Sequence, residues 1–592
     1  MKKSVLLFIS IFMISLASMA MDIDYKLMMS KPNSHYFEIE MDISDFKEKQ
    51  LEVKMPVWAP GSYLTREFAK SVNLVKAFDG AGNKLEVSKS NKNTWVINTK
   101  GIKNVKIKYE VYAFELSVRT SFLDDSHGYI NGTSVFMYVG DHKDAKGNLE
   151  IVPHASFKKI NTALPLKSGT TFTYRDYDHL ADSPIEIGNQ ETFTFDAAGV
   201  KHTVAMYGEG NYDVETLKTD MAKIVEAETK VFGENPNKDY LFIIHNLTVG
   251  SGGLEHKEST TLQVERWTYD EDNYKGFLSL VAHEYFHLWN VKRIRPKALG
   301  PFDYDCENYT DLLWVMEGFT SYYDELILRR AGFYSEDEYL AKVFSTINYV
   351  ENTPGNKVQP VAHASFDAWI KAYRHNENSS NTTISYYPKG HILAAMLDLY
   401  TINKFKSEKS LDDFLQMLYA DFYLKSDVGF TEEEFQATLE KFLGEDMSWF
   451  FDDYVYDTKT VDFKRFFKGV GLTIVNGVKS PSPFLGVRTR NSGGKLIVTS
   501  VTAGSAAERD GISVNDELIA INGNRLDKSS FDYLLKGFET GDTFELTLSR
   551  DNLIMEYTIK MGENQRDKYM KTNDFTDASK KNYDYWLRVD GK

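Results

Sequence analysis

A nine-residue segment, Val281-Ala-His-Glu-Tyr-Phe-His-Leu-Trp289, constrains this chain more than any other. It contains His-Glu-x-x-His, and helical residues four apart lie on one face, one turn from each other. His283 and His287 can therefore direct two imidazoles at a single point, which suits a zinc ion bound at about 2.0–2.1 Å. Glu284 lies beside them and can act as a general base. The alternative is a pair of core histidines on an apolar helix.

A third ligand is expected from a second helix. The apolar spacing predicts helices over 274–291 and 311–330. Glu317 stands in the second of these, in the apolar run Leu-Trp-Val-Met-Glu-Gly-Phe. A carboxylate in such a setting is costly unless it is paired or bound to a metal. Glu317 therefore completes a candidate zinc site, the alternative being an exposed face of an amphipathic helix.

Two further segments offer groups for catalysis and binding. Tyr387 precedes a long apolar helix, where its hydroxyl can enter a cleft. Gly250-Ser-Gly-Gly-Leu-Glu-His256 is a glycine-rich turn that leads into a strand, and such a turn lets another backbone approach closely. A peptide substrate can be that backbone, with Glu255 fixed beside it, or the segment is a plain loop with a solvated acid. The aromatic loop 56–63, followed by Arg66, forms either a cleft rim or a structural turn.

Composition narrows the class of protein and its location. Lys2, Lys3, an apolar run from Val5 to Leu16 and the small residues before Met21 resemble a secretory signal cleaved near Ala20. No stretch reaches the roughly 20 apolar residues of a membrane anchor. Removing the two lysines lowers the net charge from −16 to −18, which argues against nucleic acid as a partner. Cys306 is the only cysteine, so an intrachain disulfide is impossible and a periplasmic location fits.

The order of the patterns predicts a multidomain α+β protein. Residues 21–200 alternate apolar and polar positions with turn signals between them, which indicates an all-β domain of the sandwich type. Residues 201–468 mix short strands with many helices. Residues 469–563 combine strands with one short helix, and 564–592 form a polar tail.

The assembled groups resemble those of the gluzincin metallopeptidases. His283-Glu-x-x-His287 followed by Glu317 in a Glu-Gly-Phe context is similar to their zinc site. Tyr387-Pro-Lys-Gly390 resembles the Tyr-x-Lys-Gly of alanyl-type aminopeptidases, whose tyrosine stabilises the transition state. Gly252-Gly-Leu-Glu-His256 resembles their Gly-Ala-Met-Glu-Asn segment, which implies that Gly252, Gly253 and Glu255 bind the substrate and that Glu255 binds its amine. The gap from His287 to Glu317 is longer here, and His256 replaces the asparagine.

Both departures indicate a nearer family, the glycyl aminopeptidases. The segments Pro56–Tyr63, Gly253–His256, His283–Pro296 and Glu317–Tyr323 resemble its signature segments, and the resemblance runs from about residue 25 to 563. It implies an N-terminal β domain, a thermolysin-like and mostly helical catalytic domain, and a C-terminal PDZ domain. Phe484-Leu-Gly-Val487 resembles a PDZ carboxylate-binding loop: Phe484, Leu485, Gly486 and Val487 would receive a peptide C-terminus on backbone N–H groups.

The sequence thus predicts a periplasmic or secreted aminopeptidase that uses one Zn²⁺ ion. It would act on peptides with a free N-terminus, glycine or alanine being the expected first residue. Glu284 would be the base, and Tyr387 the oxyanion donor. One alternative is an endopeptidase whose PDZ domain delivers protein C-termini. Another is a periplasmic PDZ binding protein with a vestigial zinc site.

Overall fold

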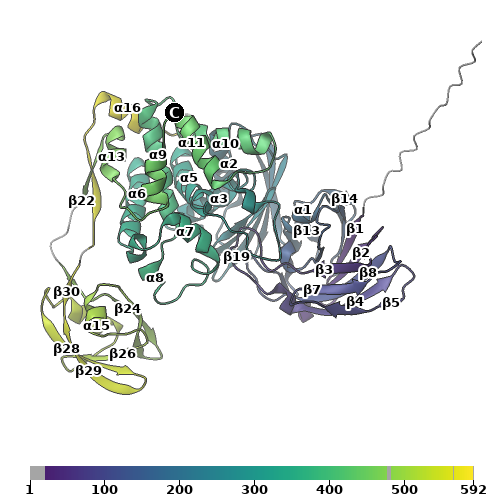
Figure 1. Cartoon of the computed structure of the whole chain (residues 1–592), viewed down its shortest axis with the longest axis horizontal. Coiled ribbons are helices and arrows are strands. Elements are labelled where there is room, and N and C mark those ends of the chain that lie inside the picture. Colours follow the sequence, from purple (N-terminus) through teal and green to yellow (C-terminus); the bar gives the residue numbers. More distant parts are fainter. Residues whose placement is uncertain (1–20, 477–481, 565, 591–592) are drawn as a thin grey trace, which may run out of the picture.

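The chain forms three bodies in sequence, as a computed structural model that describes residues 21–476, 482–564 and 566–590. The predicted signal segment 1–20 lies outside the described residues. A β domain is followed by a central domain of one sheet and many helices, and two paired strands of five residues each lead to a small β domain (Figure 1). The predicted multidomain α+β architecture is confirmed.

The N-terminal domain is built from sheets around one hydrophobic core. Its larger sheet has the order β14-β15-β12-β1-β2-β8-β4-β5, and a second has the order β11-β3-β7-β6. Alternation along β2 (Tyr36–Ile43) sends Phe37, Ile39 and Met41 into the core shared with β3 (Gln50–Lys54). The other strands of these two sheets are β1 (Ile23–Met28), β4 (Val72–Asp79), β5 (Lys84–Leu85), β6 (Val87–Lys89), β7 (Thr94–Asn98), β8 (Val105–Tyr112), β11 (Tyr138–Val139), β12 (Gly147–Val152), β14 (Leu166–Ser168) and β15 (Thr171–Tyr174).

A third sheet joins this domain to the central one. Its order is β13-β16-β10-β9, and Tyr129 on β10 packs with Leu241 and Ile243 of the central sheet. The strands are β9 (Phe122–Leu123), β10 (His127–Ile130), β13 (Lys159–Thr162) and β16 (Ile185–Gly188), and the short helix α1 (Tyr177–Ala181) precedes β16.

The central sheet has the order β17-β18-β19-β21-β20, with β20 at one edge. Its strands are β17 (Glu191–Ala197), β18 (Val200–Tyr207), β19 (Asp239–Leu247), β20 (Gly253–Glu255) and β21 (Ser259–Glu265). The sequence pattern predicts a domain boundary at 200, but β17 pairs with β18 along its whole length. This sheet therefore begins near residue 191, because the two strands form one hairpin.

Helices cover the central sheet and carry the predicted site. The principal ones are α2 (Val214–Phe232), α3 (Tyr274–Phe286), α4 (Leu313–Met316), α5 (Gly318–Arg330) and α9 (Tyr386–Lys404). The others are α6 (Glu336–Glu351), α7 (Val361–Phe366), α8 (Ser379–Thr382), α10 (Leu411–Leu418), α11 (Glu432–Leu443), α12 (Ser448–Phe450) and α13 (Phe463–Phe467). Two of the predicted helices have other bounds in the structure. The one over 274–291 ends at Phe286, since the backbone turns after His287, and the one over 311–330 is interrupted at Glu317.

The C-terminal β domain is an insertion between two paired strands. The PDZ domain was predicted to begin at 469, but β22 (Leu472–Asn476) pairs instead with β31 (Tyr569–Asn573) of the tail. Within the domain lie β23 (Pro483–Phe484), β24 (Val487–Ser492), β25 (Lys495–Val501), α14 (Ala506–Arg509), β26 (Glu517–Ile521), β27 (Asn524–Arg525), α15 (Lys528–Leu535), β28 (Thr543–Arg550), β29 (Leu553–Lys560) and β30 (Gly562–Glu563).

The tail packs on the central domain. Its helix α16 (Asp577–Trp586) lies beside α9 and α13 (Figure 1). Trp586 is fully buried, and its Nε1–H donates to the hydroxyl of Tyr322 on α5 at 2.9 Å. Across the described ranges, no helix combines the length and the apolar character needed to cross a bilayer.

Candidate metal centre and substrate cleft

His283 and His287 of α3 meet Glu317 at the junction of α4 and α5. Nε2 of His283 lies 3.5 Å, and Nε2 of His287 3.3 Å, from Oε2 of Glu317. Both separations exceed the usual length of an N–H···O hydrogen bond. Atoms bound to one tetrahedral zinc ion at about 2.0–2.1 Å are about 3.3–3.4 Å apart. The three predicted ligands therefore fit the shell of a zinc ion.

Each imidazole is oriented through its other nitrogen. Nδ1 of His283 lies 2.8 Å from Oδ2 of Asp324, and Nδ1 of His287 lies 2.7 Å from the carbonyl oxygen of Asn290. Both oxygens can only accept, so each Nδ1 carries the proton and each Nε2 keeps a free lone pair for the metal. Asp324 was missed from the sequence, although it follows Glu317 by seven residues, two helical turns along the same face.

Two glycines bring the third ligand and the predicted oxyanion donor together. A Cβ on Gly318 would lie 2.4 Å from Cα of Gly390, so α5 and α9 cross in direct backbone contact. Larger residues there would force the helices apart. Because Glu317 precedes the first glycine and Tyr387 lies three residues before the second, their contact places both side chains in one cleft.

Glu284 lies against the edge strand β20. A Cβ on Gly253 would stand 2.3 Å from Cδ of Glu284, so the space that this glycine leaves is filled by the predicted base. Oε2 of Glu284 is buried and has no hydrogen-bond partner among the described residues. Burial raises the pKa of Glu284 to about 7, the charges of both histidines oppose that rise, and Glu255 and Glu317 add to it. The positive charge of a bound ion would lower the pKa again.

All predicted metal, catalytic and substrate-binding residues line one cavity of about 340 Å³. They are Gly252, Gly253, Glu255, His283, Glu284, His287, Glu317 and Tyr387. Arg119 and Asp324 line it too and were not predicted, and Gly61 comes from the loop 56–63, one of whose two predicted roles is a cleft rim. A larger cavity of about 930 Å³, around Arg66 and Phe114, contains none of these groups.

The aromatic loop 56–63 is both a buried anchor and a wall of the cleft. Trp58 and Tyr63 are buried and pack edge-on against Trp369 of the catalytic domain. This packing holds Gly61 so close to Glu255 that a Cβ would lie 2.4 Å from its Oε1. The two readings that the sequence left open therefore both describe this loop.

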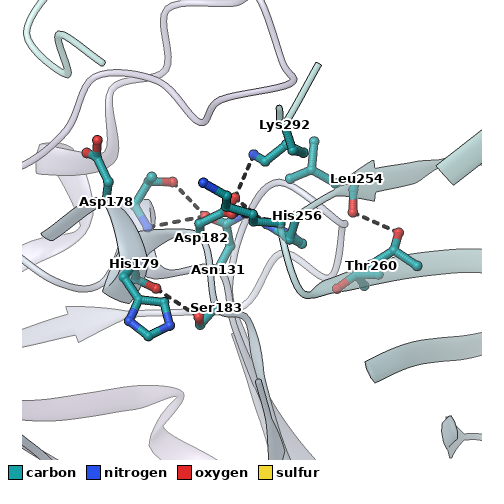
Figure 2. A network of polar contacts seen from close by, with 12 residues as sticks. Asn131, Asp178, His179, Asp182, Ser183, Leu254, His256, Thr260 and Lys292 are labelled. Carbon is teal, nitrogen blue, oxygen red and sulfur yellow. Dashed lines mark hydrogen bonds and ion pairs between the residues drawn. The ribbon is translucent and has the colours of Figure 1, made fainter. Parts of the chain in front are cut away.

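A carboxylate of the N-terminal domain holds the residues that follow β20 in place. Asp182 accepts hydrogen bonds from Nζ of Lys292 at 2.7 Å and from the backbone N–H of Lys257 at 2.8 Å, and its Oδ1 lies 3.1 Å from Nδ1 of His256 (Figure 2). His256 directly follows Glu255, and Lys292 lies shortly after α3, the helix that carries His283. Lys292 and His256 together hold the pKa of Asp182 below its usual value despite burial.

Tyr387 lies in the first turn of α9, where the hydroxyl of Ser385 accepts from its backbone N–H. Its ring stacks on that of Tyr386 and faces the ring of His283 at 6.2 Å. Burial and then the negative charge of Glu317 raise the pKa of Tyr387 well above its usual value. The hydroxyl therefore remains protonated at neutral pH and can donate a hydrogen bond.

A second cluster of metal-binding residue types has a different geometry. His127, Glu186 and His245 are fully buried where the N-terminal domain meets the central sheet. The two oxygens of Glu186 lie 2.8 Å from Nδ1 of His127 and 2.9 Å from Nε2 of His245. These are hydrogen-bond lengths, shorter than the edges of a zinc shell. The cluster is therefore a polar link between the two domains.

The predicted PDZ carboxylate loop borders a cavity of about 640 Å³. Phe484, Gly486 and Val487 line it, while Leu485 is buried in the core of the domain. Arg488 and Arg509 contribute positive charge, and residues 351–358 of the catalytic domain form the facing wall. Strand β24, which follows the loop, is the edge of its sheet, and no strand of the described residues pairs with its outer side.

Three segments of the sequence match known families. Residues 24–189 match the peptidase M61 N-terminal domain, 276–393 match the M61 glycyl aminopeptidase domain, and 483–561 match a PDZ domain. No curated protein matches the sequence.

Two solved structures illustrate the likeness. An aminopeptidase N family protein from Idiomarina loihiensis is 30% identical, with a TM-score of 0.89, over 95% of this chain and 100% of that one. An M1 zinc metallopeptidase from Deinococcus radiodurans, bound to a Tyr-Ser-Ala substrate, is 16% identical with a TM-score of 0.49, over 74% of this chain and 95% of that one.

Proposed function

The chain belongs to the M61 glycyl aminopeptidase family, and we propose that this zinc metallopeptidase removes an N-terminal glycine or alanine from peptides with a free amino group. The observation that carries the proposal is the position of Glu255. Its carboxylate lies on the edge strand, in the same cavity as the three zinc ligands. A peptide paired with that edge would meet a negative charge at its amino end.

The side chains have distinct roles in this reaction. One zinc ion held by His283, His287 and Glu317 would act as a Lewis acid and supply a nucleophilic water near neutral pH. Glu284 takes a proton from the attacking water and passes it to the leaving amine. Tyr387 donates a hydrogen bond to the carbonyl oxygen as negative charge develops there.

Glu255→Ala tests the exopeptidase assignment. We expect kcat/KM on free-amine glycyl peptides to fall by about 10- to 100-fold, because a charge-assisted hydrogen bond to the ammonium is lost. Wild-type enzyme should leave the same peptides uncut when they are N-acetylated. An unchanged rate in the variant, or cleavage of acetylated peptides, would favour the endopeptidase alternative.

We propose that the PDZ domain binds a peptide C-terminus as an added strand beside β24. Arg488 and Arg509 are among the residues that line the cavity at its carboxylate loop, and their guanidinium groups suit a terminal carboxylate. Calorimetry with a peptide library should find ligands that lose about tenfold or more in affinity on C-terminal amidation. Equal affinity of the acid and amide forms would reject this role.

We propose a periplasmic or secreted location. The supporting feature is the N-terminal pattern of two lysines, an apolar run and small residues before Met21. Fractionation followed by mass spectrometry should recover a protein that lacks about the first 20 residues. Recovery of an intact N-terminus from the cytoplasm would contradict the proposal.

A further inference from the structure

Arg119 introduces a positive charge into a cavity dominated by acids. Glu255, Glu284, Glu317 and Asp324 all line this cavity, and among its described lining residues Arg119 is the only lysine or arginine. It belongs to the N-terminal domain, in the loop between β8 and β9. Burial raises the pKa of Tyr373, whose hydroxyl lies 3.5 Å from the carbonyl oxygen of Gly61, and the charge of Arg119 opposes that rise. Arg119 thus lines the cleft and lies close enough to Tyr373 to influence it.

The guanidinium of Arg119 has no partner in the described part of the protein. Its Nε is buried without a hydrogen bond, and no carboxylate lies within ion-pair distance of it. Arg119 is half-buried, so the rest of its guanidinium remains accessible to a ligand in the cleft. None of the four acids that line the same cavity forms an ion pair with Arg119.

The loop around Arg119 is held rigidly. The carbonyl oxygen of Val118 accepts from the hydroxyl of Tyr129 at 3.3 Å and from Nδ2 of Asn131 at 3.2 Å. The hydroxyl oxygen of Tyr129 also lies 3.0 Å from Oγ1 of Thr261 in the central domain, whose hydroxyl can donate to it. The backbone that carries Arg119 is thus fixed against the sheet that carries the substrate edge.

We propose that Arg119 is a specificity residue that binds a carboxylate of the peptide substrate while Glu255 binds its ammonium. A guanidinium presents paired N–H donors that match a carboxylate. The carboxylate has two sources, an acidic side chain on the N-terminal residue or the terminal carboxylate of a dipeptide. The first source would extend the preference from glycine to acidic residues, and the second would select very short peptides. The inference rests on the proposed aminopeptidase function.

Two arms of matched peptides test the proposal with the zinc-loaded, full-length enzyme. The first arm compares Glu-Ala-Ala amide with Gln-Ala-Ala amide and tests recognition of an acidic side chain on the N-terminal residue. The second arm compares Gly-Ala with Gly-Ala amide and tests recognition of the terminal carboxylate of a dipeptide. In at least one arm we expect wild-type kcat/KM to favour the charged member by about tenfold or more. Arg119→Gln should bring that ratio close to one, with less than about a threefold change on the neutral peptide.

Controls separate this outcome from general damage and from failure of the proposed function. Arg175→Gln removes one charge from an exposed, weakly paired arginine of the same domain and should keep the wild-type ratio. Arg119→Lys retains the charge but lacks the paired N–H donors, so it should keep part of the preference for the charged peptide. A wild-type ratio near one in both arms, or the same ratio in Arg119→Gln, would overturn the proposal. Failure of wild-type enzyme on both neutral free-amine peptides would instead reject the aminopeptidase function.

Discussion

Glu284→Gln is expected to lower kcat by about 10³-fold while zinc remains bound. Glutamine keeps the shape of the side chain against Gly253, but its amide cannot take the proton of the attacking water. The metal should remain, because His283, His287 and Glu317 supply the three groups at ligand spacing. Turnover of a glycyl peptide and zinc content by mass spectrometry measure the two effects.

Glu228→Gln provides a matched control for that variant. Glu228 is fully buried on α2, and neither of its oxygens has a hydrogen-bond partner in the part of the chain that the structure describes. Burial raises its pKa well above the usual value. Glutamine therefore mimics the protonated acid, and activity should stay close to that of wild type. Retention of a tenth or more of the activity in Glu284→Gln would show that Glu284 is not the base. Loss of its zinc would contradict the expectation that His283, His287 and Glu317 are enough to hold the metal.

Tyr387→Phe is expected to reduce kcat by about 10²- to 10³-fold, the usual cost of one oxyanion donor. The ring and its packing on Tyr386 remain, so KM and zinc content should change little. The hydroxyl acts only as charge develops on the carbonyl oxygen, which is why kcat is affected. Steady-state kinetics with a glycyl peptide gives both constants.

Tyr386→Phe removes a hydroxyl from the neighbouring ring, which does not line the cavity. It should leave kcat within about threefold of wild type. If the two variants lose activity equally, packing of the tyrosine pair, not a donor at 387, explains the loss.

Much of the site could be predicted because its residues recur at helical spacing. His283 and His287 are one turn apart, and an acid in the apolar run around Glu317 needs a partner. The contact between α5 and α9 could not be predicted, because it depends on two glycines 72 positions apart in the sequence. Arg119 and Asp182 could not be predicted either, because both belong to another domain and no periodic pattern marks them. Arg119 lines the cleft, whereas Asp182 contacts residues beside it.

The fold shows the same division between local and distant effects. Alternation identified the N-terminal sheets, but hairpin pairing moved β17 into the central sheet. The tail looked polar and unassigned, yet Trp586 fills a buried position against Tyr322 and Tyr339. This packing depends on partner residues more than 200 positions away, so a local sequence pattern could not predict it.

The paired strands at the base of the PDZ domain determine how that domain can be removed. Stopping the protein at residue 476 would also delete β31 and α16, stripping the catalytic domain of a packed strand and of Trp586. Any resulting inactivity would then report damage to the enzyme core. Asn476 lies directly opposite Tyr569 in antiparallel register. A two-residue hairpin turn can therefore join these residues. The resulting protein would lack the PDZ domain but would keep the paired strands β22 and β31.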